Sequence, residues 1–174
     1  MRYMKFFILA LFVFSMVSMS EAALPKKGSI AVIAQNNQEV DSTTTDFVTN
    51  VIINRLLGNG YKIVDRKALE RIRRDKATVL ALEGNVEAIM KLSSQYGYST
   101  LLTVQVGEIQ SWRDDFGFYG AIASIMAKAM ASNGSIIYAD EAESKEVGHR
   151  KTEVIQSAVR AASQLAADRM IEVK

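Results

Sequence analysis

Short apolar runs alternate with segments of helical periodicity along most of this chain. The run at residues 29–34 is long enough for one buried strand and too short for a helix. After a polar stretch in which Asp41 or Ser42 can cap a helix, apolar residues recur at helical spacing up to a Gly-Asn-Gly turn at residues 58–60. This order predicts a first strand followed by a first helix.

The same order repeats in the next part of the chain. Residues 61–64 predict a second strand, and a second helix is expected to begin beyond Asp65 with its apolar positions facing inward. A third helix is predicted over residues 86–96, and it stops at Gly97. The second and third helices follow each other without an intervening strand.

The second half of the chain has strand patterns first. Apolar and polar residues alternate most clearly at 102–106, and Gly107 then interrupts the pattern as a bulge or bend does. The alanines and methionines of residues 121–131 favour a helix by propensity, although their apolar positions fit either period. The two-residue turn signal at 133–134 leads into the apolar residues 136–138, so we predict that these two runs form a hairpin.

A long alanine-rich helix is predicted at the end of the chain, starting near His149, with one wide apolar stripe. The element order is therefore β-α-β-α-α-β-β-β-α. Right-handed crossovers make the first three strands parallel, and the last two strands form an antiparallel hairpin. The prediction is an α/β (α+β) fold in which helices pack on a mixed sheet of about five strands. The stripe contains Val154, Ala158, Val159, Ala161, Ala162, Leu165, Ala166 and Met170.

The beginning of the chain has the pattern of an export signal. Two basic residues precede the uncharged apolar run 6–19, and residues 20–22 (Ser-Glu-Ala) place small residues at both cleavage-reading positions. A membrane-spanning helix needs about 20 apolar residues, and this run is shorter. We predict a signal peptide at residues 1–22 and a single domain at residues 23–174, with an uncleaved membrane anchor as the alternative.

Composition limits the chemistry available to this chain. It has no cysteine, which excludes disulfides, thiolate catalysis, thiolate metal sites and a lipid-modified cysteine. Its 21 basic and 19 acidic residues give a net charge of +2, which argues against a nucleic-acid binder. We therefore expect an exported, periplasmic protein that is soluble after signal cleavage and is not a lipoprotein.

Three blocks of residues are similar to a known family. In residues 56–72 a glycine turn is followed by the sequence Tyr-Lys-Ile-Val-Asp-Arg. In residues 96–108, Gly97 comes before a predicted strand and Gly107 after it. Residues 133–138 precede the alanine-rich helix. On these blocks the chain resembles the extracytoplasmic domain of the curli-type secretion component. The amino-terminal domain of the Tol translocation protein and activators of peptidoglycan synthases share this outline.

Two departures limit what this resemblance implies. The curli component is a lipoprotein that forms an outer-membrane pore from hairpins, whereas this chain has no cysteine and only residues 111–120 between its third and fourth strands. A membrane-crossing strand needs about 9 to 11 residues in each direction, so this loop is too short. The Tol protein continues into a propeller, for which no residues remain here. The resemblance therefore implies the bare α/β module.

Two candidate sites lie around the second helix. Asp65 and Arg66 form an acid–guanidinium pair of a kind found in active sites, but Asp65 is also well placed to cap the helix. The basic residues of this helix are interleaved with acidic ones, so a solvated face is the simpler interpretation. The alternative is that Arg71, Arg73 and Arg74 dock to an acidic partner or to anionic phospholipid headgroups.

The segment 112–119 is the strongest candidate for partner contact. It holds aromatic residues among charged residues and glycine, where the chain is expected to turn between strands. Exposed aromatic side chains on a loop are typical of interface anchors. The alternative is that the first and last of them cover the end of the core. The predicted partner-binding residues here are Trp112, Phe116, Phe118 and Tyr119.

Candidates for catalysis or metal binding are weak. His149 is the only histidine, so the usual zinc ligand sets cannot form without cysteine. Ser135 or Ser144 with His149 and Asp140 are close in sequence, but they lack a nucleophile elbow. No glycine pattern fits a phosphate loop. We expect no catalytic residue, no metal and no cofactor.

Three functions are compatible with these observations. The leading hypothesis is a noncatalytic periplasmic protein-binding module that supports assembly or secretion of a cell-envelope structure. Its partner is expected to be an envelope protein, and a homo-oligomer and a peripheral membrane contact are further options. The second hypothesis is a regulatory binder of a peptidoglycan synthase, and the third is a small secreted hydrolase. Neither nucleic acid nor a small-molecule substrate is expected as a partner.

Overall fold

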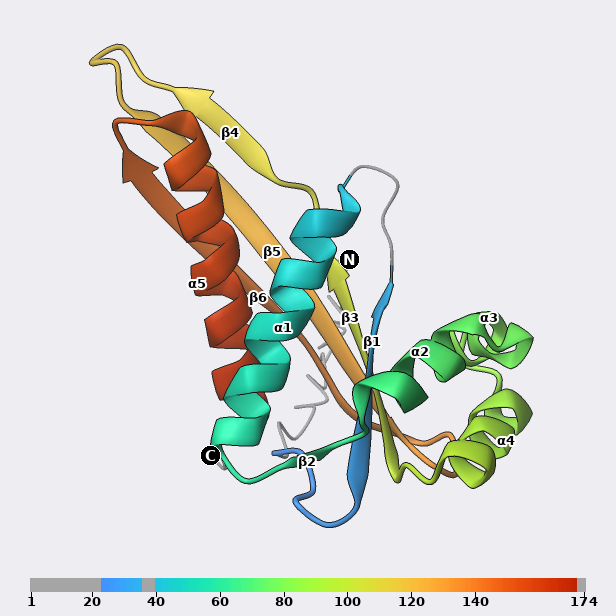
Figure 1. Cartoon of the computed structure of the whole chain (residues 1–174). Helices are drawn as coiled ribbons and strands as arrows, with labels where there is room; N and C mark the ends of the chain where they lie inside the picture. The colour runs from blue at the N-terminus through green and yellow to red at the C-terminus, as the bar shows by residue number, and fades with distance from the viewer. Residues whose placement is uncertain (1–22, 36–39, 172–174) are drawn as a thin grey trace, which may run out of the picture.

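A six-stranded sheet with helices on both faces forms the described part of the chain (Figure 1). The computed structural model describes residues 23–35 and 40–171, and the predicted signal peptide lies outside these ranges. The strands are β1 (Ser29–Gln35), β2 (Lys62–Ile63), β3 (Thr100–Val106), β4 (Gln110–Arg113), β5 (Tyr119–Ala131) and β6 (Ile136–Gly148). The helices are α1 (Ser42–Gly58), α2 (Arg66–Arg74), α3 (Lys76–Leu82), α4 (Val86–Tyr96) and α5 (Lys151–Ile171).

The sheet is mixed, as predicted. β1 runs parallel to β2 and to β3, which confirms the crossover connections of the first three predicted strands. β3, β4 and β6 are antiparallel to β5, and β5 with β6 forms the predicted hairpin. One edge of β5 pairs with β3 near its end and with β4 near its beginning, while β6 follows the other edge. β2 and β6 therefore lie at opposite edges of the sheet.

Helices cover the two faces of the sheet unequally (Figure 1). On one face α1 and α5 pack together over a core that includes Val32, Leu102 and Ile125. On the other face α2, α3 and α4 cover β1 and the adjoining part of β3, with Ile33 and Leu101 in a second core. None of the described helices is long and apolar enough to cross a membrane.

Local signals start and stop the helices at the predicted residues. The Asp41 carboxylate accepts a hydrogen bond from the Thr44 backbone amide at 2.8 Å, and it caps α1. Asp65 caps α2 in the same way, accepting from the Ala68 amide at 3.0 Å. α4 ends at Gly97, whose φ of 70° is left-handed and suits glycine. Asp65 thus has a structural role that explains its position before a basic helix.

Two elements were not predicted, α3 and β4. α3 follows α2 directly, because an extended Asp75 ends α2 and then caps α3 by accepting the Ala77 amide hydrogen bond at 3.0 Å. That amide also holds the pKa of the Asp75 carboxyl below its ordinary value. No glycine or proline marks the break in the sequence. β4 pairs with β5 inside the segment 111–120 that was expected to be a loop, and β6 continues to Gly148 instead of ending near Tyr138.

α5 packs on the β5–β6 hairpin through small side chains. Ala158 and Ala162 of α5 belong to the same buried core as Ala123 and Ala127 of β5. Alanine on both sides lets a helix lie close to a sheet, and the interdigitating atoms leave little free volume. The alanines of residues 121–131 therefore fit the helix that covers them, and this tertiary fit outweighs their helix propensity.

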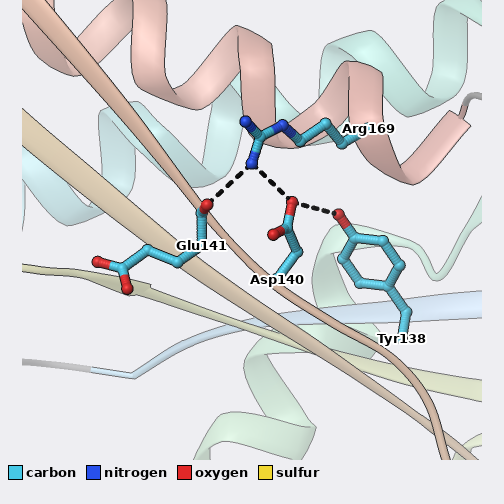
Figure 2. A network of polar contacts seen from close by, with 4 residues as sticks. All are labelled: Tyr138, Asp140, Glu141 and Arg169. Carbon is cyan, nitrogen blue, oxygen red and sulfur yellow. Dashed lines mark hydrogen bonds and ion pairs between the residues drawn. The ribbon is translucent and has the colours of Figure 1, made fainter. Parts of the chain in front are cut away.

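A polar network holds the last turns of α5 against β6 (Figure 2). Arg169 donates to the Asp140 carboxylate at 3.0 Å and to the backbone carbonyl of Glu141 at 2.9 Å. The Tyr138 hydroxyl donates to the same Asp140 oxygen at 3.3 Å. The network therefore fixes the position of α5 along the hairpin that it covers.

Replacing Ala162 with leucine should destabilise the protein. Ala162 is fully buried between α5 and the sheet, and overpacking such a site costs about 1–3 kcal/mol. Urea unfolding followed by circular dichroism should show a lower midpoint than for the wild type. Gln164→Leu places the same side chain at an exposed position of α5 and should change the free energy of unfolding by less than about 0.5 kcal/mol. Equal midpoints for Ala162→Leu and the wild type would contradict the close packing.

Candidate protein-interaction surface

The connection between β4 and β5 is a rigid hairpin loop built around Asp114. The Asp114 carboxylate accepts hydrogen bonds from the amides of Phe116 at 3.0 Å and Phe118 at 2.8 Å. The Asp114 amide donates to the Phe118 carbonyl at 2.9 Å, and the Gly117 amide donates to the Asp114 carbonyl at 3.1 Å. Gly117 has a φ of 87°, which only glycine adopts without strain. One aspartate therefore determines the shape of the whole loop.

Phe116 projects from the tip of this loop into solvent. Its exposed fraction is 88%, the highest among the large hydrophobic residues that the structure describes. The bonds from the amides on either side of Gly117 to the Asp114 carboxylate hold the backbone at this point. Burial of such a side chain would have to come from another molecule.

Trp112 lies on the face of the sheet opposite to α5. Its six-membered ring rests on Gly120 of the neighbouring strand, where an added Cβ would come within 2.2 Å of ring atoms. The Lys145 ammonium lies 5.2 Å from the ring centroid, in a cation–π arrangement. The indole is 39% exposed, so one side of it is held by the sheet and the other is open.

The remaining two aromatic residues of this segment have different surroundings. The Phe118 ring is 4.7 Å from the His149 ring, centroid to centroid, and it is 37% exposed. Tyr119 packs against the core under α5, and the Arg113 guanidinium lies 5.4 Å from its ring. Tyr119 thus packs at the end of the core, as the alternative interpretation expected for Trp112 and Tyr119, and its part in partner contact stays a prediction. Trp112, Phe116 and Phe118 remain as accessible aromatic groups, and we call these three the aromatic tip.

The three arginines predicted to act together lie on different sides of α2. Arg73 lines the groove between α1 and α2. Arg71 is two residues from Arg73, so the two side chains leave the helix in different directions. Arg74 lies one turn from Arg71 on the same side. The part of these three arginines in binding stays a prediction.

Sequence reasoning missed the groove between α1 and α2, which we call the α1–α2 groove. It has a volume of about 470 Å³ and lies beside the edge strand β2. Its apolar lining includes Ile53, Leu57 and Ile63. Its charged lining consists of two arginines and three carboxylates, namely Arg66, Arg73, Asp46, Asp65 and Glu70. In the sequence, Leu57 and the seven-residue spacing of Arg66 and Arg73 were the signals from which the groove could have been inferred. Neither signal shows that β2 lies at an edge of the sheet. The groove could therefore be identified only from the order of the strands in the structure.

The residues considered for hydrolysis are not gathered at one place. Asp140 is engaged by Arg169, and the Ser135 hydroxyl donates to Asn133 at 2.7 Å. His149 follows the far end of β6, and fourteen residues of extended chain separate it from Ser135, a path of about 45 Å. Ser144 is five residues from His149, about 16 Å along the strand. These distances do not allow a nucleophile, a base and an orienting acid to form hydrogen bonds to one another.

Comparisons with known proteins define the fold of this chain. No family model and no curated protein matches it. Lipoprotein GNA1162 from Neisseria meningitidis matches with a TM-score of 0.57 and 20% identity, over 80% of this chain and 98% of that one. The hypothetical protein CT253 from Chlamydia trachomatis matches with a TM-score of 0.54 and 11% identity, over 83% and 98%. The PelC dodecamer from Paraburkholderia phytofirmans matches with a TM-score of 0.51 and 12% identity, over 86% and 93%.

These matches support the coarser part of the predicted resemblance. The chain has an α/β fold that also occurs in lipoprotein GNA1162. The likeness to the curli component in particular stays a prediction. At identities below 25% the matches concern the fold alone.

The predicted location is contradicted. We expected a soluble periplasmic protein that is not a lipoprotein, but GNA1162, a solved structure with this fold, is a lipoprotein. The expectation rested on the absence of cysteine. The absence of cysteine is a property of this sequence, whereas the likeness to GNA1162 concerns the fold.

Replacing Gly120 with alanine should release Trp112 from the sheet. The added methyl group would occupy the position of the ring, so the indole would move outward into solvent. Because Trp112 is the only tryptophan, its fluorescence reports this directly, with emission at longer wavelength and stronger quenching by iodide. Gly58→Ala, where an added Cβ has no neighbour within 4 Å, is the matched control and should leave the emission unchanged. Identical spectra for Gly120→Ala and the wild type would contradict the stacking.

Proposed function

We propose that this chain is a noncatalytic protein-binding module of the bacterial cell envelope and that the aromatic tip is its contact surface. The observation that carries the proposal is the exposed ring of Phe116 on a loop that Asp114 fixes. An aromatic side chain that is exposed to solvent contributes little to the stability of the protein that carries it. Burying it in a partner contributes about 1.5–3 kcal/mol.

The rigidity of the loop favours binding as well. Ordering a flexible loop on association costs conformational entropy, and a loop that is already ordered avoids most of this cost. Trp112 is held by Gly120 and Lys145, and Phe118 is held by His149. The aromatic tip therefore presents three rings in a defined arrangement, as interface anchors usually do.

The finer form of the proposal concerns the partner. We expect an envelope protein, and we expect the binding to support assembly or secretion of a cell-envelope structure. The PelC dodecamer has this fold, which supports self-association as part of such a role. The Ser135 hydroxyl, the His149 imidazole and the Asp140 carboxylate each have other partners and lie apart. This separation supports a binding role over a hydrolytic one.

Replacing Phe116 with alanine should reduce the recovery of a partner from envelope extracts by about tenfold or more, since interface anchors contribute at least 1.4 kcal/mol or so. Quantitative mass spectrometry of the captured proteins measures this loss. Val79→Ala is the matched control, because Val79 is also an exposed apolar residue but lies on α3, away from the hairpin. Equal recovery with both variants would contradict the proposal. Capture of a peptidoglycan synthase that depends on Phe116 would make the chain a regulatory binder instead.

Replacing Arg71, Arg73 and Arg74 with glutamate tests whether these arginines bind anionic phospholipid headgroups. Each arginine near an anionic membrane surface contributes about 1 kcal/mol, so the variant should lose binding to vesicles that contain anionic phospholipid. Co-sedimentation with anionic and with neutral vesicles measures this loss. The matching lysine variant keeps the charge and should keep the binding. Unchanged association of the glutamate variant with envelope membranes would remove these residues from the proposal.

A further inference from the structure

β6 has an open backbone along the edge that faces away from β5. The Gly107 amide donates to the Ser124 carbonyl at 2.9 Å, so Ser124 directs its backbone groups away from β6. Ser124 is paired with Glu143, and the amide and carbonyl of Glu143 therefore also point away from β5. Backbone groups alternate in direction along a strand, so Glu141 and Lys145 are oriented like Glu143. Among the described strands, only β5 pairs with β6.

α5 occupies one position of this edge. Arg169 donates to the Glu141 carbonyl at 2.9 Å, which agrees with the outward direction of that group (Figure 2). The bond limits an added strand to the part of β6 that follows Glu141. Residues 142–148 of β6 remain, and they span about 20 Å of extended chain. This length is enough to pair with a strand of average size.

The face of the sheet opposite to α5 is acidic along this edge. Ala142 is buried under α5, so its neighbours Glu141 and Glu143 direct their side chains to the opposite face, where both are exposed. Neither glutamate forms an ion pair within the described residues. An added strand would therefore meet two carboxylates that have no basic partner of their own.

Two lysines lie on the same face, and both have other surroundings. The Lys145 ammonium lies 5.2 Å from the ring centroid of Trp112 on β4, so it is directed across the sheet and away from the edge. The Lys128 ammonium lies beside Gly84, 4.0 Å from the place that a Cβ would take there. The negative charge of the two glutamates is thus available to another molecule.

α5 borders the other side of the edge. Leu165 and Ala161 precede Arg169 by four and eight residues, so they lie on the side of α5 that faces β6. Leu165 is 36% exposed, and Ala161 is half-buried. Farther along, Glu146 of β6 and Lys151, five helical turns before Arg169, contribute one charge of each sign. This side therefore offers apolar contact without net charge.

We propose that the β6 edge binds, by strand addition, an extended segment of a partner protein in which basic and apolar residues alternate. Successive side chains of an added strand point to opposite faces, so its basic residues would lie beside Glu141 and Glu143 and its apolar residues against Leu165. A second copy of β6 would place carboxylates against carboxylates, which repel each other. The inference adds a contact to the proposed binding module, and to that extent it rests on that function.

The edge also leads to the aromatic tip. β6 ends at Gly148, which is paired with Tyr119 at the beginning of β5, directly after Phe118. Val147, one residue earlier, is 60% exposed and is paired with Gly120, on which the Trp112 ring rests. A segment bound along β6 would therefore lie next to the aromatic tip, so one partner can contact both surfaces.

A labelled peptide tests the pattern of this segment. The probe has about eight residues in which lysine and valine alternate, and fluorescence polarisation measures its binding to the purified protein. It should bind at least about tenfold more tightly than a peptide of the same composition in which all the lysines precede all the valines. Only the alternating peptide matches both sides of the edge, while the charge of the two peptides is the same.

Methylation of the peptide backbone tests strand addition itself. Only alternate amides of an added strand face its neighbour. Methylating either the lysine amides or the valine amides should therefore abolish binding, and methylating the other set should leave it. Both methylated peptides keep their charge and their side chains, so attraction by charge alone would affect them equally.

Variants of the protein locate the contact. Glu141→Gln with Glu143→Gln should weaken binding of the alternating peptide by about fivefold, as expected for the loss of two exposed ion pairs. Glu83→Gln with Glu87→Gln changes the charge by the same amount beside α4 and should bind like the wild type. Phe116→Ala should also bind the peptide like the wild type, so failure of this contact is distinguishable from failure of the aromatic tip. Circular dichroism confirms that each variant is folded.

Four results would overturn the proposal. They are equal binding of the alternating and the block peptide, equal effects of the two methylations, unchanged binding by the variant with both edge glutamates replaced, and self-association of the wild type that this same variant abolishes. The last result would assign the β6 edge to a second copy of the chain.

Discussion

The packing of α5 on the β5–β6 hairpin is the interaction on which the rest of this structure depends. β5 joins β3, β4 and β6 into one sheet, and α5 covers most of its length on one side. The contact is made by small side chains, such as Ala123 and Ala162, that leave little free volume. Arg169 and Asp140 then fix α5 along the hairpin at its far end. The position of every functional surface is set relative to this unit.

One consequence is that the aromatic tip is supported by paired strands of the sheet. The tip lies where β4 and β5 continue past β3, and β5 and β6 are still paired beneath it. Asp114 shapes the loop, and Gly120 gives the Trp112 ring a flat surface on which to rest. A rigid sheet that presents exposed aromatic groups suits recognition of another protein better than it suits catalysis, which needs polar groups that converge.

A second consequence is that the β2 and β6 edges of the sheet differ. β2 is short and is flanked by α1 and α2, so its edge lies beside a groove that is lined by both arginine and carboxylate side chains. β6 is long, carries carboxylates and is covered on one face by α5. Exposed edges of this kind are normally blocked or paired, because unpaired backbone groups attract other strands.

The sequence by itself determined the types of the elements other than α3 and β4, and it indicated the helix caps at Asp41 and Asp65. It also determined the parallel and antiparallel connections, since these features follow from local periodicity, capping chemistry and chain handedness. It also indicated the aromatic segment. It did not indicate the start of α3, because Asp75 ends one helix and begins the next without a glycine or proline. Only the tertiary structure decided that Tyr119 packs under α5 while Phe116 is exposed, that Arg73 is separated from Arg71, and that β2 and β6 are edges. Which side chain is buried, and which strand lacks a neighbour, depends on segments that are distant in the chain, and local pattern carries no information about them.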